Sequence, residues 1–184
     1  MATPPQPLPS IVYAVYCGPI DQAAVQKITQ GLSRATTESV KEVHVMFQSL
    51  GGGVGDGIAL YNFFRAFTVD LTLYNVGNIS SIALVSYLGA KRRRTNTFAT
   101  FMTHRTTSPA IALEGGKLKA MTESVVLDDQ RTEAILRKHI TMPEDKWAAL
   151  ETGLWLTAAE AVKFGIADEI AEFAPPVGSK IFFF

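Results

Sequence analysis

The amino-acid sequence predicts an α/β fold built on a mostly parallel sheet that crossover helices flank. Segments rich in β-branched and aromatic residues alternate with segments of helical spacing, and short glycine-containing turns separate them. Parallel neighbours in a sheet need such crossover connections, so this alternation is typical of the α/β class. With 184 residues, 47% of them hydrophobic and 18% charged, the chain has the composition of a compact domain. We expect one domain over residues 11–184, after a disordered proline-rich leader at residues 1–10.

The order of the elements follows from local patterns. Strands are predicted where β-branched and aromatic residues cluster, at residues 11–16, 43–47, 71–76 and 97–103. Helices are predicted where apolar residues recur at helical spacing. The first begins after the cap residue Asp21, and its pattern loosens at residues 31–33. The others are predicted at residues 55–65, 80–88 and 157–165. In the last helix Thr157 and Glu160 form a capping box, and Gly165 ends the helix.

Several other features are predicted to serve structure or assembly. A helical pattern over about residues 117–140 is too long for a simple crossover, so we expect it to project from the core as a handle. Three exposed phenylalanines at residues 182–184 would lower solubility, so they are predicted to dock on a neighbour or to cover a groove. The basic run Lys91–Arg94 is predicted to be a solvated loop or a partner in intersubunit ion pairs. His44 and His139 are predicted to be structural histidines.

Charge and composition narrow the classes of partner. The 17 basic and 17 acidic residues cancel, so no overall field favours nucleic acid or an anionic membrane. No stretch reaches the roughly 18 to 20 uninterrupted apolar residues that a membrane span needs. The single Cys17 cannot form an internal disulfide or a zinc-binding cysteine group. We therefore expect no structural metal and a reducing, cytoplasmic location.

Two glycine-containing turns, at residues 49–53 and 77–81, each follow a predicted strand and open a helix. Backbone N–H groups at such a turn stabilise a developing negative charge, and a serine there can act as a nucleophile. The base for Ser81 would be His104, which ends the strand after the Ser81 helix. A phosphate-binding GxxxxGK[ST] motif does not occur in the sequence. Taken alone, the turns are also compatible with tight backbone and with Ser80 or Ser81 as a helix cap.

Four sequence blocks carry a resemblance to a known family. They are, in chain order, SLGGGVGDGIALYNFF, GNISSIALVSYLGAKRRRT, FMTHR and LWLTAAEAVKFGIADEI. They combine a glycine turn after a buried strand, Gly-x-x-x-Ser at a helix start, Met-x-His at a strand end, and a Leu-Thr-Ala-x-Glu-Ala-Val block. In this order and spacing they resemble the Clp protease proteolytic subunit (ClpP) family of the ClpP/crotonase superfamily, over about residues 11–170.

The resemblance implies a serine-type endopeptidase that cleaves peptides or unfolded protein segments and needs no cofactor. It implies that Ser81 is the nucleophile and His104 the general base. It also implies that the backbone N–H groups of Gly52 and Ile82 form the oxyanion hole. The helical pattern over residues 117–140 fits the handle that joins rings in this family, which implies a homo-oligomer.

The chain departs from the family pattern at the orienting acid, at the N-terminus and in the segment after His104, residues 105–116. Where the family has an aspartate that orients the histidine, this chain has Gly153, and disabling that group costs on the order of 10⁴ in rate. Glu151 is the nearest substitute, and Thr152 or a water molecule is the alternative. The family's N-terminal helix and pore loops, which meet an ATPase unfoldase, have no counterpart before the first predicted strand. The standard docking of that ATPase is therefore not expected.

Two other functions remain open at this point. Gly153 makes a catalytically silent ClpP-like subunit or scaffold a competitor of the peptidase. A crotonase-type acyl-CoA enzyme shares the two-amide oxyanion hole, but it needs nearby carboxylates and a pocket for the CoA group. The chain is short for such an enzyme and carries serines where crotonases have glycines.

Overall fold

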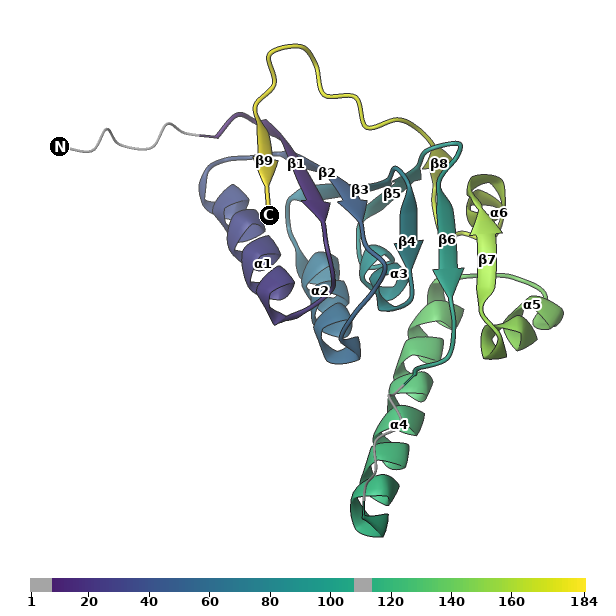
Figure 1. Ribbon diagram of the computed structural model, residues 1–184. Coiled ribbons are helices and arrows are strands. Elements are labelled where there is room, and N and C mark those ends of the chain that lie inside the picture. Colours follow the sequence, from purple (N-terminus) through teal and green to yellow (C-terminus); the bar gives the residue numbers. More distant parts are fainter. Residues whose placement is uncertain (1–7, 108–113) are drawn as a thin grey trace.

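The computed structural model describes residues 8–107 and 114–184, and its core is a six-stranded sheet in which all neighbouring strands run parallel (Figure 1). In spatial order this sheet comprises β8 (Glu169–Ile170), β5 (Arg92–Thr95), β3 (Asp70–Asn75), β2 (Glu42–Gln48), β1 (Ile11–Cys17) and β9 (Ile181–Phe183). A three-stranded sheet comprises β4 (Asn78–Ser80), β6 (Thr100–Thr103) and β7 (Leu154–Thr157), of which β6 and β7 pair antiparallel. The helices are α1 (Gln22–Thr37), α2 (Val54–Ala66), α3 (Ile82–Tyr87), α4 (Gly115–His139), α5 (Glu144–Ala148), the 3₁₀ helix η1 (Ala149–Glu151) and α6 (Ala158–Lys163). The predicted α/β class is confirmed.

The core lies between the large sheet and the helices that connect its strands. Every second residue of β1 and β2 is buried, and the buried side chains pack against the apolar stripe of α1. Asp21 caps this helix as predicted, because its carboxylate accepts the N–H of Ala24 at 2.8 Å. The stripe consists of Ala24, Ile28, Leu32 and Ala35, and the helix continues without a break to Thr37.

The prediction of a solvated loop at Lys91–Arg94 is wrong, because residues 92–95 form β5 between β3 and β8. Lys91 and Arg92 pair with Asp70, while Arg93 pairs with Asp168 at 3.1 Å and Arg94 with Glu169 at 2.7 Å. Asp70 lies on β3, and the other two acids lie at β8. Three of the four basic residues thus lie in a strand of the sheet, and carboxylates at residues 70, 168 and 169 pair with the run from either side.

Two element boundaries also differ from the prediction. Residues 78–80 form β4 where a helix was expected from Ser80, and the helix α3 begins only at Ile82. The fourth predicted strand is shorter than expected, since β6 begins at Thr100. By contrast, the capping box between Thr157 and Glu160 is present as predicted.

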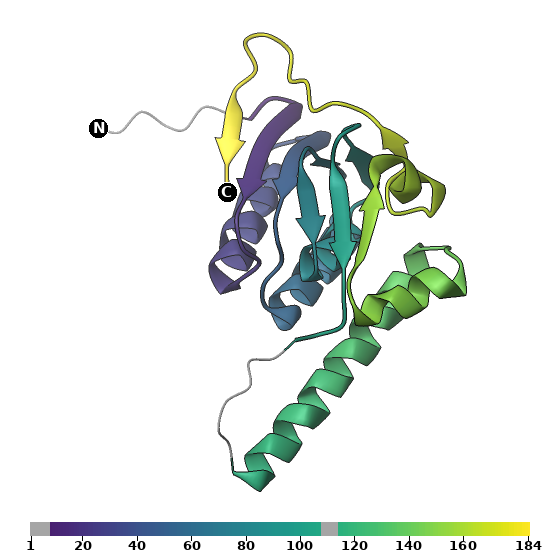
Figure 2. The same cartoon turned by 45° about the vertical axis from the view of Figure 1, so that its right-hand side comes forward.

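The long helix α4 projects from the body of the molecule, as predicted (Figures 1 and 2). Among its described side chains only Leu136 is buried, and its apolar Leu118, Val126 and Leu127 are exposed. Its C-terminal end is attached to the core through His139. That imidazole contacts the hydroxyl of Tyr61 through Nε2 at 2.9 Å and accepts from Arg93 Nη1 through Nδ1 at 3.3 Å. His139 is therefore structural, as predicted.

The attachment of α4 is expected to weaken in acid. Burial, assisted by the positive charges of Arg93, Lys138 and Arg65, lowers the pKa of His139 from 6.5 to about 4. Between these two values the unfolded chain binds a proton at His139 that the native chain does not, so stability falls as the pH decreases through this window. Because His139 is half-buried and solvent screens its charge, we expect the free energy of unfolding to fall by about 1 kcal/mol, which lowers Tm by roughly 2 to 4 °C.

Thermal unfolding of the wild type and of His139→Gln between pH 6.5 and pH 4 tests this expectation. Glutamine cannot take up the proton, so the difference in Tm between the two proteins should change across this window. Parallel pH profiles of the two proteins would show that His139 is not the group responsible.

The chain end forms the edge strand β9, which includes Phe182 and Phe183, and Phe184 follows directly after it. β9 pairs with β1 in parallel, Ala14 opposite Phe182, and the N–H of Phe184 donates to the carbonyl of Val15 at 3.1 Å. Phe182 and Phe184 pack against the core, whereas Phe183 is 78% exposed. The ring of Phe184 lies over Gly31 in the middle of α1, where an added Cβ would be well under 3.0 Å from it. Gly31 thus provides the seat for this ring.

The effect of Gly31→Ala on the free energy of unfolding is expected to change sign with the residue at position 184. In an ordinary helix interior, alanine is more stable than glycine by about 0.5 to 1 kcal/mol. Here the new Cβ displaces the Phe184 ring, so we expect a net loss of about 1 kcal/mol in the wild type. In a Phe184→Ala background the same change should stabilise the protein by up to about 1 kcal/mol. Chemical denaturation of the four proteins measures this coupling. Equal effects of Gly31→Ala in both backgrounds would show that the Phe184 ring does not depend on Gly31.

The N-terminal leader lies largely outside the described residues, which begin at Leu8. The predicted disorder does not extend over residues 8–10. The N–H of Leu8 donates to the Glu38 carboxylate at 2.7 Å, and the carbonyl of Ser10 accepts the N–H of Lys41 at 2.8 Å. In the ranges that the structure describes, none of the helices is both long enough and apolar enough to span a bilayer.

Candidate active site

Ser81 and His104 follow directly after two neighbouring strands of the small sheet. β4 and β6 are parallel, with Ser80 opposite Met102, so the carboxyl ends of both strands meet at the same edge. There Ser81 and His104 line one cavity of about 70 Å³ together with Gly52 and Ile82. The structure thus brings together four of the five site residues that the sequence predicts.

The backbone of Ser81 holds its side chain at the sharp turn from β4 into α3. The N–H of Ser81 donates to the carbonyl of Met102 at 2.7 Å and continues the pairing of β4 with β6. The chain then turns at φ 56° and ψ −134°, a conformation that residues with a Cβ rarely adopt. Such strain is found where a turn must present one side chain, and here Ser81 is partly exposed in the cavity.

Ser80 is occupied by other contacts. Its side chain is buried, and its hydroxyl donates to Asn78 Oδ1 at 2.5 Å. Its N–H donates to the carbonyl of Ser49. Ser80 is absent from the residues that line the cavity, so of the two adjacent serines Ser81 has the geometry of a nucleophile.

The glycine turn after β2 presents the N–H of Gly52 to the same cavity. The carbonyl of Gly51 and the N–H of Gly53 both bond to Ile20, at 2.9 and 2.7 Å, so the polar groups of Gly52 between them point away from Ile20. The N–H of Gly51 is taken by Ser49 Oγ at 3.1 Å. In the described part of the chain, the N–H groups of Gly52 and Ile82 donate to no protein acceptor, and Ile82 opens α3. Two backbone donors are thus available beside Ser81.

His104 is oriented by the main chain rather than by a carboxylate. Its Nδ1 lies 2.5 Å from the carbonyl oxygen of Arg105. Because a carbonyl only accepts hydrogen bonds, Nδ1 is the donor, and in the neutral imidazole Nε2 then keeps its lone pair. In the described residues no hydrogen bond joins His104 to Ser81 or to Glu151. The bond to the adjacent carbonyl has no signal in the sequence, because any residue supplies a carbonyl.

Glu151 lies close to this segment but contacts Arg105. Its carboxylate accepts from Arg105 Nε at 3.0 Å, and its side chain is 68% exposed. Glu133 on α4 binds the other end of the same guanidinium and is itself bound by Arg137. Arg105 lowers the pKa of the Glu133 carboxyl, with a smaller contribution from Arg137.

A further acid of α4 fixes the next residue. Asp129 accepts the N–H of Thr106 at 2.6 Å, so residues 105 and 106 are both held against α4. Sequence reasoning did not identify Asp129 or Glu133, because they lie on α4, more than twenty residues after the segment they bind.

Gly153 occupies an open position beside the site. It has φ 96°, and an added Cβ would meet nothing within 4 Å. The described residues that line the cavity include no carboxylate and are Gly52, Val54, Ser81, Ile82, Val85, Thr103, His104, Thr106, Thr107, Thr132 and Leu136. Groups of three or more His, Cys, Asp or Glu side chains suited to a metal ion do not occur in residues 8–107 and 114–184.

Comparisons with known proteins point in one direction. The chain is 21% identical to the ATP-dependent Clp protease proteolytic subunit 3 of Rhizobium etli over 156 residues, which cover 83% of this chain and 80% of the relative. It is 26% identical to the corresponding subunit of Bdellovibrio bacteriovorus over 157 residues, covering 83% and 74%. Its fold is similar to the structure of a ClpP1 mutant from Listeria monocytogenes, with a TM-score of 0.76 and 18% identity over 89% of this chain and 91% of that one.

A family model also matches most of the chain. The model of the Clp protease family matches residues 11–174, which include both glycine turns, His104 and the capping box of α6. On this match, the chain belongs to the Clp protease family.

Proposed function

We propose that this chain is a serine-type endopeptidase that cleaves peptides or unfolded protein segments. The observation that carries the proposal is the meeting of Ser81, His104 and two unoccupied backbone donors in one cavity. The Ser81 hydroxyl attacks the substrate carbonyl while His104 Nε2 takes its proton. The N–H groups of Gly52 and Ile82 stabilise the resulting oxyanion, and His104 returns the proton to the leaving amine. Water then attacks the acyl-enzyme carbonyl while His104 Nε2 takes its proton, and the proton passes to Ser81 Oγ as the ester bond breaks and the acid product leaves.

The Arg105 carbonyl takes the place of the orienting acid in this mechanism. It selects the tautomer with a free Nε2, which is one of the two roles of the acid in a serine triad. A neutral carbonyl stabilises the imidazolium less than a carboxylate does, so the centre is expected to be slower than one with a full triad. We propose that Glu151 acts through Arg105 as a positioning residue.

Loss of Glu133 is expected to slow the reaction more than loss of Glu151. Glu133→Gln removes the less exposed of the two carboxylates that hold Arg105, so the carbonyl that orients His104 shifts. Misplacement of this kind costs about 10- to 100-fold in rate. The measurement is the rate of labelling of Ser81 by a fluorophosphonate. Glu144→Gln is the matched control, because Glu144 shares Arg137 with Glu133 but does not contact Arg105. A loss of about 10⁴ confined to Glu151→Gln would mean that Glu151 orients His104 directly.

The intact mass of the protein after incubation with a fluorophosphonate tests the proposed function itself. This reagent reacts with a serine that a nearby base and an oxyanion hole activate. We expect a single adduct, located at Ser81 by peptide mapping and absent from Ser81→Ala. An unreactive assembled protein would favour the silent subunit, for which the absence of a carboxylate beside His104 in the described residues is the specific observation.

The acyl-CoA alternative fits the site less well. Crotonase chemistry needs carboxylates at the oxyanion hole, and no described residue that lines this cavity has one. The cavity of about 70 Å³ is also far below the roughly 300 Å³ at which small-molecule pockets begin. A change in Tm on addition of acetyl-CoA would support this alternative.

We further propose that α4 mediates assembly into a homo-oligomer. A projecting helix that exposes Leu118, Val126 and Leu127 leaves apolar surface for another copy to cover. Sedimentation of the wild type should give a multiple of the 20.0 kDa chain mass, and Val126→Glu should reduce it. A monomeric wild type at micromolar concentration would contradict this proposal.

A further inference from the structure

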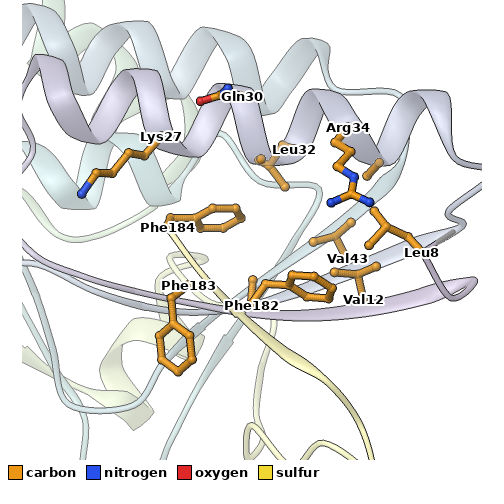
Figure 3. Close-up of a pocket in the computed structure, with 13 residues that line it drawn as sticks. Leu8, Val12, Lys27, Gln30, Leu32, Arg34, Val43, Phe182, Phe183 and Phe184 are labelled. Carbon is orange, nitrogen blue, oxygen red and sulfur yellow. The ribbon is translucent and has the colours of Figure 1, made fainter. Parts of the chain in front are cut away.

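A second and larger cavity lies between α1 and the edge of the large sheet formed by β1 and β9 (Figure 3). Its volume is about 530 Å³, and it shares no lining residue with the cavity at Ser81. Pockets of roughly 300 to 1,000 Å³ are typical of small-molecule sites. Neither the peptidase mechanism nor the proposed assembly through α4 uses this cavity.

Each element that forms the cavity contributes apolar side chains to its walls. Val12 and Ala14 come from β1, Leu32 and Ala35 from α1, and Phe182 to Phe184 from the chain end. Figure 3 shows Phe182 and Phe184 turned toward α1, while Phe183 points away from it. The chain end thus forms the floor of the cavity, and a ligand there would contact mainly hydrocarbon.

The polar lining consists of side chains along the exposed side of α1. Arg34 is already neutralised, because its Nε donates to Glu38 at 2.5 Å, and the other oxygen of Glu38 accepts the N–H of Leu8. Lys27 pairs with no carboxylate in the part of the chain that the structure describes, and Gln30 is neutral. Among the charged side chains that line the cavity, Lys27 is therefore the one without a carboxylate partner in the described residues.

The charge and the apolar walls have a defined arrangement. Lys27 and Arg34 are seven residues apart on one helix, so they lie about 10 Å apart along its axis. Figure 3 shows Lys27 at one end of the cavity, Arg34 and Leu8 at the other, and Leu32 and Phe184 between them. A ligand that fits would have one anionic group at the Lys27 end and an apolar body extending toward Leu8. A dianion would need donors beyond the single ammonium group.

We propose that this cavity binds a monoanionic amphiphile with one alkyl chain, of the fatty-acid class. The carboxylate lies at the Lys27 ammonium group, and the chain lies beneath α1 against Leu32, Ala35 and the two inward phenylalanines. A lysine suits this role because its flexible stem can follow a headgroup at the rim while its charge stays in water. This site is separate from Ser81 and does not depend on the peptidase activity.

Titration calorimetry of the full chain with dodecanoate, below its critical micelle concentration, tests the proposal. We expect one binding site per chain, and a dissociation constant about tenfold weaker in Lys27→Gln. Lys138→Gln, an exposed lysine on α4, is the matched control and should bind as the wild type does. Dodecyltrimethylammonium, which has the same chain and the opposite charge, should bind at least tenfold more weakly than dodecanoate. Equal affinity for the two amphiphiles, or an unchanged affinity in Lys27→Gln, would overturn the assignment of the headgroup.

Filling the cavity tests the location of the alkyl chain. Ala35→Leu places three further carbons in the cavity and should weaken dodecanoate binding at least tenfold. Because Ala35 is buried, Leu8→Trp at the partly exposed rim is the second variant, and it can block the cavity without disturbing the core. Unchanged affinity in a folded filling variant would overturn the proposal.

Two further measurements separate this site from other possibilities. Ser81→Ala should bind dodecanoate as the wild type does, so failure of the peptidase proposal leaves this result intact. If the filling variants change the sedimentation coefficient while the wild type binds no dodecanoate, the cavity is an interface with a second copy and the proposal is wrong.

Discussion

Ser81→Ala is expected to lose peptide hydrolysis almost completely. In a serine peptidase with a full triad, removal of the nucleophile costs about 10⁶ in kcat, and removal of the acid alone costs about 10⁴. In a centre without a carboxylate, the serine is therefore still expected to raise kcat by at least about 100-fold. We expect hydrolysis of a fluorogenic peptide to fall by about 100-fold or more in Ser81→Ala.

Two comparisons make this experiment specific. His104→Ala should cost about as much as Ser81→Ala, and the double variant little more, because the two residues act as one unit. Ser80→Ala should keep most of the activity, since the Ser80 hydroxyl is buried against Asn78. Loss of activity in Ser80→Ala but not in Ser81→Ala would exchange the roles of the two serines.

Gly52→Ala is expected to damage both the oxyanion hole and the fold. An added Cβ would lie well under 3.0 Å from backbone atoms of Ile20, which cannot move aside as a flexible side chain can. The turn must therefore shift, and with it the N–H that faces the cavity. Loss of one oxyanion donor costs about 10² to 10³ in rate. We also expect a loss of about 2 to 4 kcal/mol in unfolding free energy.

Gly55→Ala is the matched control for this glycine turn. Gly55 lies in the first turn of α2, and an added Cβ there meets nothing within 4 Å. Alanine favours the helix by up to about 1 kcal/mol, so this variant should be as stable as the wild type or more so, with unchanged labelling of Ser81. Fluorophosphonate labelling rates and urea unfolding of both variants give the result. Normal labelling of Ser81 in Gly52→Ala would show that the N–H of residue 52 takes no part in the mechanism.

Signals that depend on neighbouring residues can be read from the sequence by itself. The alternation of strands and helices predicts the α/β class, Asp21 and the Thr157–Glu160 pair mark two helix starts, and the handle follows from the length of one helical pattern. The four ordered blocks also indicate Ser81, His104, Gly52 and Ile82 as candidates, and these residues line one cavity in the folded chain. Each of these signals lies within a short segment, where spacing and residue type are enough.

Other features depended on contacts between distant segments. Lys91–Arg94 has the composition of a solvated loop, but residues 92–95 pair with β3 and β8, and acids at residues 70, 168 and 169 neutralise the basic side chains. His104 is oriented by a backbone carbonyl that every residue possesses, held in place by acids of α4. The chain end adds to β1 because a glycine in α1 leaves room for Phe184. Charges, carbonyls and cavities act at distances of a few ångströms, and folding alone sets which distant residues come that close.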